Sequence, residues 1–129
     1  GNDGIDFSNS IVEIENLKIM NAKDKCISIG EKSDINLNNI YLDKCYIAIA
    51  VKDSSKVNII GSLITNNNKY DLAAYIKKNI FRESSIEINT NNKVNLNVIS
   101  EKGTNLSINK NKFRNNSENV FDRLYKNEI

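Results

Sequence analysis

Apolar and polar residues alternate along most of this chain, and the alternation itself repeats. Residues 26–35 read C-I-S-I-G-E-K-S-D-I, and residues 48–57 read A-I-A-V-K-D-S-S-K-V, which keeps the apolar positions after a shift of 22 residues. Alternation with a period of two is typical of a β-strand, and a repeat of roughly 20 to 50 residues is typical of a solenoid. The pattern therefore predicts strands that stack in successive coils.

Each coil contains three short alternating segments separated by polar corners. The side chains expected to point inward are Ile5, Phe7, Val12, Ile14, Leu17 and Ile19 in the first coil, Ile27, Ile29, Ile35, Leu37, Ile40 and Leu42 in the second, and Ile49, Val51, Val57, Ile59 and Ile64 in the third. This arrangement favours an all-β fold, a right-handed parallel β-helix of about five coils with three sheets. We place the coils of this single domain at about residues 3–23, 24–45, 46–68, 69–100 and 101–117.

The two ends of the predicted solenoid differ. Four apolar residues recur at helical spacing within residues 118–129, namely Val120, Phe121, Leu124 and Tyr125, and they predict a short helix that caps the last coil. A decorated fourth coil precedes it, with a loop expected at residues 77–85. The first coil has no comparable cap. We therefore expect this chain to be part of a longer β-helix whose open end meets the remainder of its own chain or associates end to end with another copy.

The polar corners are expected to stack as well. Asn16 falls over Asn39 and Asn36 over Asn58 when the coils are aligned, and so do two further pairs, Ser33 with Ser55 and Asp34 with Lys56. Proline is absent and glycine numbers only 5, so the turns depend on asparagine, which tolerates the left-handed region better than other non-glycine residues. Stacked polar pairs of this kind set the register of the strands.

Composition and charge narrow the function classes. The formal net charge is only +2, which gives no field that would hold a phosphate backbone, so we expect no nucleic-acid partner. No stretch of the chain is long and apolar enough to predict a membrane span, and none resembles a signal peptide. Histidine is absent, which removes the commonest general base and the commonest transition-metal ligand.

The two cysteines, Cys26 and Cys45, are spaced neither as a C-x-x-C motif nor as one full coil. Their spacing disfavours a zinc site. We interpret them as two small buried thiols near coil corners, with a disulfide as the alternative if the bond can cross a corner.

The coils resemble the right-handed β-helices of the pectin-lyase-like superfamily over about residues 3 to 113. Asn2-Asp3-Gly4-Ile5-Asp6, followed by Asp24-Lys25-Cys26-Ile27, is similar to two motifs of the polygalacturonases, N-T-D-G-I-D and D-D-C-I-A. The resemblance implies catalytic aspartates at Asp3 and Asp24. Lys25 stands where the third aspartate of that family belongs, and the later motifs of the family have no counterpart here.

Two further likenesses bear on function. Polysaccharide lyases of this fold use a lysine or arginine as the base beside a uronate carboxylate, which makes Lys25 a candidate; nearby carboxylates would keep Lys25 protonated, so we expect an ion-paired lysine instead. Residues 70–78 and the corner sequences G-E-K-S (30–33) and V-K-D-S-S (51–55) are similar to solenoid modules of large bacterial surface proteins. This likeness implies an extracellular or cell-surface location, with the export signal outside this chain.

Two sets of side chains could bind ligands. Glu31 and Asp53 occupy equivalent corners one coil apart, above Asn9, and such a column of oxygens is a candidate calcium site or, less favourably, an acid and base pair. No other cofactor is expected. The tyrosines Tyr41, Tyr46, Tyr70 and Tyr75 are candidates for stacking against sugar rings.

The sequence thus favours a noncatalytic or catalytically incomplete β-helix module of an extracellular bacterial protein, which binds a glycan or serves as a structural spacer. The alternative is the C-terminal part of a polysaccharide lyase or glycoside hydrolase, so enzymatic activity stays open.

Overall fold

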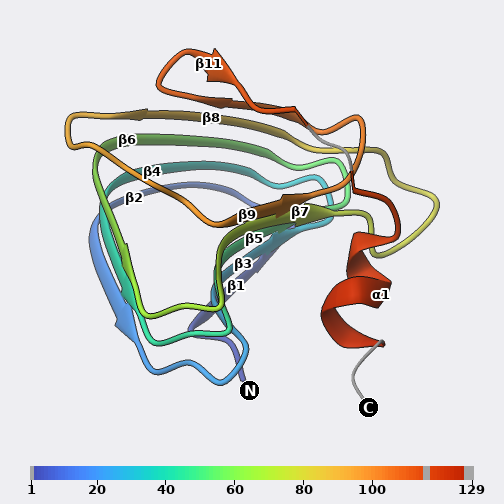
Figure 1. Ribbon diagram of the computed structural model, residues 1–129, viewed down its shortest axis with the longest axis horizontal. Helices are drawn as coiled ribbons and strands as arrows, with labels where there is room; N and C mark the ends of the chain where they lie inside the picture. Colours follow the sequence, from blue (N-terminus) through green and yellow to red (C-terminus); the bar gives the residue numbers. More distant parts are fainter. Residues whose placement is uncertain (1, 115–116, 127–129) are drawn as a thin grey trace.

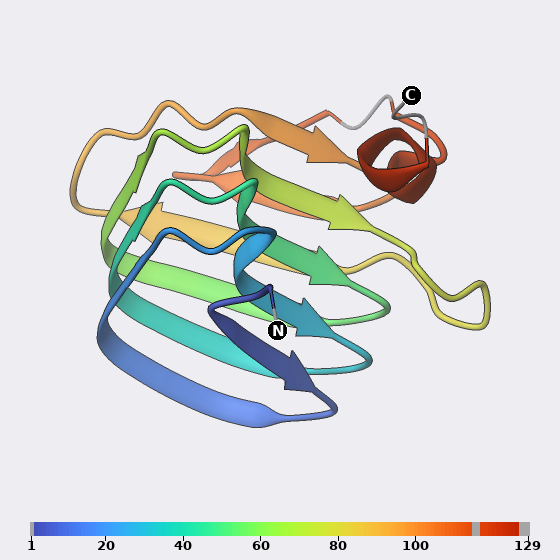
Figure 2. The ribbon, with the colours of Figure 1, turned by 90° about the horizontal axis from the view of Figure 1, so that it is seen from below.

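The chain winds as a parallel β-solenoid of about five turns, as predicted. The computed structural model describes residues 2–114 and 117–126. Figures 1 and 2 show the turns stacked one upon another, with the strands of successive turns side by side. Residues 115–116 of the predicted fifth coil and residues 127–129 of the predicted cap lie outside the described residues.

Two hydrogen-bonded sheets form the walls of the solenoid. The first has the strand order β1-β3-β5-β7-β9 and comprises β1 (Ile5–Ser8), β3 (Lys25–Gly30), β5 (Ile47–Lys52), β7 (Tyr70–Tyr75) and β9 (Val98–Ser100). The second has the order β11-β10-β8-β6-β4-β2 and comprises β2 (Ile11–Met20), β4 (Asp34–Asp43), β6 (Lys56–Asn66), β8 (Ser85–Thr90), β10 (Asn105–Ile108) and β11 (Asn111–Lys112). Every pair except β10 with β11 is parallel.

The second sheet is bent, and here the structure differs from the three separate segments expected in each coil. The strands β2, β4 and β6 turn a corner without ending, at Asn16 (φ 60°), Asn39 (φ 60°) and Gly61 (φ 75°). A single left-handed residue redirects the backbone while the ladder continues on both sides of it. The bent sheet therefore supplies two faces of the solenoid, and the five-stranded sheet supplies the third (Figure 1).

The predicted register is confirmed through the first two coils. Ile5 pairs with Ile27, Ile14 with Leu37, and Leu17 with Ile40. The stacked polar pairs also form: the Asn39 side-chain amide donates to Asn16 Oδ1 (3.3 Å) and that of Asn58 to Asn36 Oδ1 (3.0 Å). The inward residues of the second coil are fully buried, whereas those of the first coil are only half-buried because no further coil covers them among the described residues.

The prediction that Ile64 points inward is wrong. Asn38 pairs with Ile60 and Ile40 pairs with Leu63, so two residues of β6, Gly61 and Ser62, face the single residue Asn39. This bulge shifts the alternation by one, so Leu63 is 2% exposed and Ile64 is 40% exposed. Glycine is required at the bulge because a Cβ on Gly61 would collide with the side chains of Asn38 and Asn39.

The last turns depart from the regular repeat. The predicted loop is present between β7 and β8, without a helix, and it projects from the body in Figure 2. Strand β11 was expected to continue a fifth coil, but it folds back antiparallel on β10 through a turn at Asn109 (φ 49°) and Lys110 (φ 69°). Two consecutive left-handed residues are typical of a tight hairpin turn. The short strand β11 is therefore the C-terminal edge of the bent sheet.

The predicted C-terminal helix exists as α1 (Val120–Tyr125) but does not lie over the last coil. It packs on the outer face of the five-stranded sheet, where its four predicted apolar residues join a second hydrophobic core with Tyr46, Ile47, Ala50, Tyr70, Ala73, Tyr75 and Ile99. Figure 1 shows α1 beside this sheet, outside the coil. The solenoid interior forms the other core, which contains Leu106. No helix of the described residues is long and apolar enough to cross a membrane.

Candidate functional site

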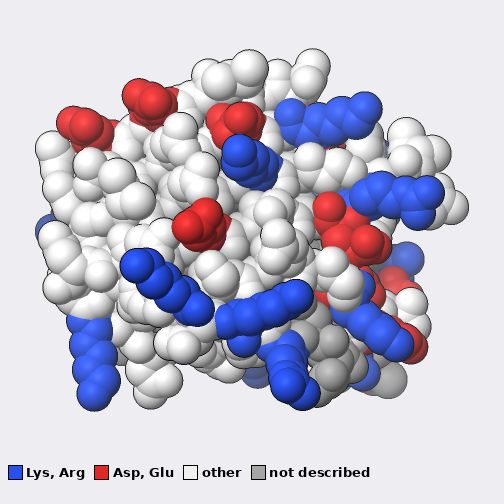
Figure 3. Space-filling view, turned by 90° about the horizontal axis from the view of Figure 1, so that it is seen from above, with Lys and Arg blue, Asp and Glu red and all other residues white. Residues whose placement is uncertain are grey.

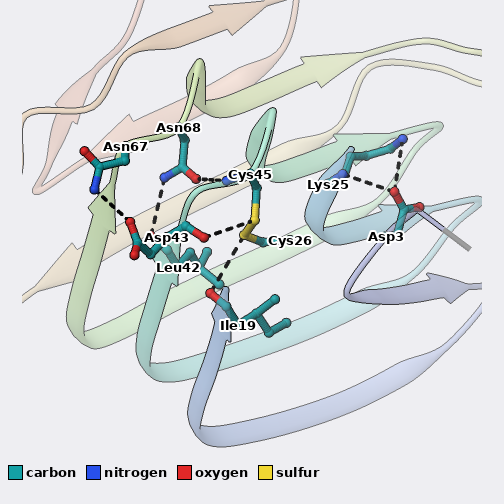
Figure 4. The surroundings of a disulfide bond; sticks show 9 residues. All are labelled: Asp3, Ile19, Lys25, Cys26, Leu42, Asp43, Cys45, Asn67 and Asn68. Atoms are coloured by element: carbon teal, nitrogen blue, oxygen red, sulfur yellow. Dashed lines mark hydrogen bonds and ion pairs between the residues drawn. A yellow bond between two sulfur atoms is a disulfide. The ribbon is translucent and has the colours of Figure 1, made fainter. Parts of the chain in front are cut away.

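Cys26 and Cys45 form a disulfide, so the prediction of two free thiols is wrong and the alternative is confirmed (Figure 4). Their Cα atoms are 5.7 Å apart. Cys26 lies at the start of one coil in β3, and Cys45 follows β4 at the end of the same coil, one layer further along the stack. The bond therefore closes a nearly complete turn diagonally across a corner, and both cysteines are buried.

Side chains from the next coil support this corner. The Cys45 N–H donates to Asn68 Oδ1 (2.8 Å), and the Asn67 side-chain amide donates to Asp43 Oδ1 (2.9 Å). Lys44 has a φ of 58°, which turns the chain toward Cys26. The spacing alone could not reveal the bond, because it joins residues of different columns instead of stacked equivalents.

The structure brings the three predicted catalytic candidates together beside this disulfide. Lys25 Nζ lies 2.5 Å from Asp24 Oδ2 and 3.6 Å from Asp3 Oδ1, and the Lys25 backbone N–H donates to Asp3 Oδ1 (3.1 Å). Lys25 is buried, at 8% exposure. The lysine is ion-paired as expected, and both carboxylates are engaged in holding it.

A small pocket of about 210 Å³ lies between this cluster and α1. Its lining consists of Asp24, Lys25, Lys52, Tyr75, Lys77, Phe121 and Tyr125. The Tyr125 hydroxyl donates to Asp24 Oδ1 (2.9 Å), and Lys25 Nζ lies 5.2 Å from the centre of the Tyr125 ring. The helix thus closes one side of the pocket and contacts the charged cluster directly.

Lys52 is a pocket residue that the sequence did not indicate as a site candidate. Its Nζ donates to Ser28 Oγ (2.6 Å). Burial lowers the pKa of Lys52, and the nearby positive charge of Lys25 lowers it further. One signal could have found it: Lys52 follows Gly30 by one coil, and a Cβ on Gly30 would lie 2.9 Å from Lys52 Cε. The glycine leaves room for the lysine to lie across β3.

The buried phenols add a second electrostatic feature of the pocket. Burial raises the pKa of Tyr75 well above its usual value. Burial also raises the pKa of Tyr125, and the neighbouring Tyr75 and the hydrogen bond to Asp24 add to this effect. Both phenols therefore stay neutral, and Tyr125 also serves as a hydrogen-bond donor to Asp24.

Three of the four tyrosines predicted to contact sugar rings pack against α1. The Tyr46 hydroxyl donates to the Leu124 carbonyl (2.8 Å), and its ring centre lies 6.0 Å from that of Tyr70. Tyr75 is 2% exposed, and its ring centre lies 5.9 Å from that of Phe121. Tyr41 lies elsewhere, on β4, where Lys18 Nζ is 5.1 Å from the ring centre. The tyrosines therefore do not form one stacking surface.

The corner column proposed for calcium has the predicted stacking, with left-handed φ values at Asn9 (48°), Glu31 (47°) and Asp53 (57°). Both of its carboxylates bind the loop between β7 and β8. Asp53 is fully buried, and its Oδ1 accepts the N–H groups of Lys77 (2.8 Å) and Lys78 (3.2 Å). The column therefore anchors the loop between β7 and β8.

Glu31 engages the same loop through an ion pair with Lys78. The hydrogen bond to Lys78 lowers the pKa of Glu31 and raises that of Lys78. Within residues 2–114 and 117–126, no group of three or more acidic or cysteine side chains is placed to hold a metal ion. Asp53 Oδ2 is buried without a hydrogen-bond partner among the described residues, but a calcium ion at this column would have to displace Lys78 from Glu31.

The surface charge is mixed on the face shown in Figure 3, where basic and acidic side chains stand among uncharged ones. Such a surface offers no broad field of one sign for a polyanion. Comparisons of the chain with protein-family models, with curated proteins and with solved structures gave no match. The geometry of the chain itself therefore carries the functional argument.

Proposed function

We propose that this chain is a noncatalytic β-solenoid module of an extracellular bacterial protein, and that it serves as a structural spacer. One observation carries the proposal: the side chains best suited to bind or react are engaged within the protein. Lys25 is ion-paired to Asp3 and Asp24, and α1 covers Tyr46 and Tyr75. Groups held in this way keep a rigid shape and leave little free chemistry for a ligand.

The location rests on two supports. A buried disulfide persists in oxidising compartments such as the cell exterior and is rare in the cytosol. The coil motifs also resemble the pectin-lyase-like superfamily and solenoid modules of bacterial surface proteins. Both supports are consistent with an exported protein.

Glycan binding is the second candidate, and the pocket beneath α1 favours it. Lys25, Lys52 and Lys77 line this pocket together with two tyrosine rings, a combination suited to the carboxylate and ring of an acidic sugar. A buried lysine with a lowered pKa, such as Lys52, is also what a polysaccharide lyase requires of its base. The pocket volume of about 210 Å³ lies below the range of roughly 300 to 1,000 Å³ usual for ligand sites, which favours the spacer.

A panel of neutral and uronate polysaccharides separates these functions. The spacer function predicts no saturable binding and no rise in ultraviolet absorbance from unsaturated products. Binding without turnover would identify a glycan-binding module, and an absorbance rise would identify a lyase. Lys52→Met removes one of the three lysines of the pocket, and Lys112→Met, at an exposed position of β11, is the matched control. Binding that Lys52→Met abolishes and Lys112→Met preserves would place the ligand beneath α1.

A further inference from the structure

Strand β2 (Ile11–Met20) is an edge strand of the bent sheet among the described residues, and its pattern of exposed and half-buried positions reads the same in both directions. It lies at the end of the bent sheet, with β4 as its only neighbour among the described residues. Its burial pattern is symmetric about the point between Glu15 and Asn16, next to the bend at Asn16. Val12, Ile14, Leu17 and Ile19 are half-buried, whereas Ile11, Glu13, Glu15, Asn16, Lys18 and Met20 are exposed. An edge of this kind is a template for pairing with another strand.

We propose that two copies of this chain pair through β2, antiparallel, about a two-fold axis that passes between Glu15 and Asn16. This axis lays the first arm of each bent strand over the second arm of the other copy, with the bend at each Asn16 directly beside the axis. Opposed residues of an antiparallel pair point to the same face. Here every half-buried residue meets a half-buried residue, and every exposed residue meets an exposed one.

The charges across this axis are complementary. Glu13 faces Lys18 of the second copy, and the two-fold axis repeats the pair, so both ion pairs form at once. Glu15 faces Asn16 of the second copy. The Oδ1 atom of Asn16 already accepts a hydrogen bond from Asn39, and its amide N–H groups have no acceptor among the described residues. They are available to the opposing carboxylate.

The apolar side chains match in the same register. Val12 faces Ile19 and Ile14 faces Leu17 of the second copy, which continues the solenoid interior across the junction. Ile11 is 88% exposed and Met20 is 42% exposed, and these two outward side chains also face each other. Pairing would therefore bring these two exposed apolar residues into contact and complete the burial of the inward side chains of the first coil.

The contact closes on itself. An isologous two-fold contact uses the same surface on both copies and stops at a dimer. Head-to-tail addition to β2 would require a matching parallel edge at the other end of the bent sheet, where β11 instead folds back antiparallel on β10. Sliding the strands by one residue relative to each other opposes half-buried residues to exposed ones, because burial along each arm alternates with a period of two.

Sedimentation equilibrium of the full chain tests the proposal. The parent should have the mass of a dimer at roughly 100 μM, well above the micromolar Kd of a modest specific contact. Glu13→Lys converts both ion pairs into repulsive pairs and should weaken association roughly tenfold or more. Combining Glu13→Lys with Lys18→Glu reverses both partners and should restore the dimer. Glu87→Lys is the matched control, because Glu87 is exposed in the same column of the sheet but on β8, away from the edge.

Circular dichroism and a thermal melt confirm that each variant is folded before its mass is compared. A parent that stays monomeric at this concentration would overturn the proposal, as would a mass that grows beyond the dimer with concentration. A combined variant that associates as weakly as Glu13→Lys alone would overturn the register. A Glu87→Lys variant as weak as Glu13→Lys would show that net charge, not the β2 edge, controls association.

Discussion

Loss of the Cys26–Cys45 disulfide should destabilise the chain by about 3 kcal/mol. The bond joins cysteines separated by 19 positions, and closing a loop of this length restricts the unfolded chain by about 3 kcal/mol at 25 °C. For a chain of 129 residues, this change in the free energy of unfolding lowers the Tm by about 10 °C. The perturbation is Cys26→Ala combined with Cys45→Ala, and the assay is thermal unfolding followed by circular dichroism.

Reduction supplies the matched control. A reductant should lower the Tm of the parent by a similar amount, and it should leave the Tm of the double alanine variant unchanged because that variant has no disulfide to reduce. Thiol titration of the unfolded, unreduced parent should find no free thiol. Two free thiols, together with a parent Tm that ignores reductant, would refute the disulfide and restore the sequence-based interpretation of buried thiols.

Three other predictions follow from named contacts. Leu63→Asp should unfold the chain, since an unpaired buried carboxylate costs several kcal/mol, whereas Ile64→Asp should melt like the parent; equal melts would contradict the bulge at Gly61. The free energy of unfolding should fall as the pH rises above about 10. Folding raises the pKa of Tyr75 and Tyr125, so these phenols ionise in the unfolded chain before they ionise in the folded one. Tyr125→Phe should reduce this loss, as measured by chemical denaturation at increasing pH. Calcium should not raise the Tm relative to chelator, because the carboxylates of Glu31 and Asp53 already have partners in the loop; a calcium-dependent rise that Glu31→Gln removes would revive the metal site.

The solenoid and its register were predictable because strand alternation and stacking depend on the same residues. Ile27 pairs with Ile49 and Ile35 with Val57, as the shift of 22 residues indicated. The prediction failed at Ile64 because Leu63 and Ile64 are adjacent and both apolar. The alternation alone therefore could not show that β6 contains one extra residue, which makes Leu63 the inward one. Gly61, a glycine within an apolar strand, was the available sign of a bulge.

The docking site of α1 was harder to predict, because helical spacing identifies an apolar face but not the surface that it covers. The sequence did contain a signal. The run Ile47-Ala48-Ile49-Ala50-Val51 in β5 is apolar at every position, and β7 continues this with Leu72-Ala73-Ala74-Tyr75. Strands buried on both faces have such unbroken runs. The outer face of these two strands is where α1 packs.

The candidate site was predictable in part. Asp3, Asp24 and Lys25 do converge, because the first two coils stack in register. The involvement of Lys52 and Tyr125 depends on the position of α1, which joins residues 101 positions apart through the Tyr125 hydrogen bond to Asp24. A pattern of neighbouring residues cannot predict a contact between positions so far apart in the sequence.

Helix α1 covers the outer face of the five-stranded sheet, so Tyr46, Tyr70 and Tyr75 stabilise the fold and are not free to bind a ligand. Nitration by tetranitromethane, mapped to each tyrosine by peptide mass spectrometry, tests it most directly, because the reagent attacks accessible ionised phenols. We predict that Tyr41, which lies away from α1, is modified first and that Tyr75 is resistant, being 2% exposed with a raised pKa. Nitration of Tyr75 as rapid as that of Tyr41 in the folded chain would contradict the claim.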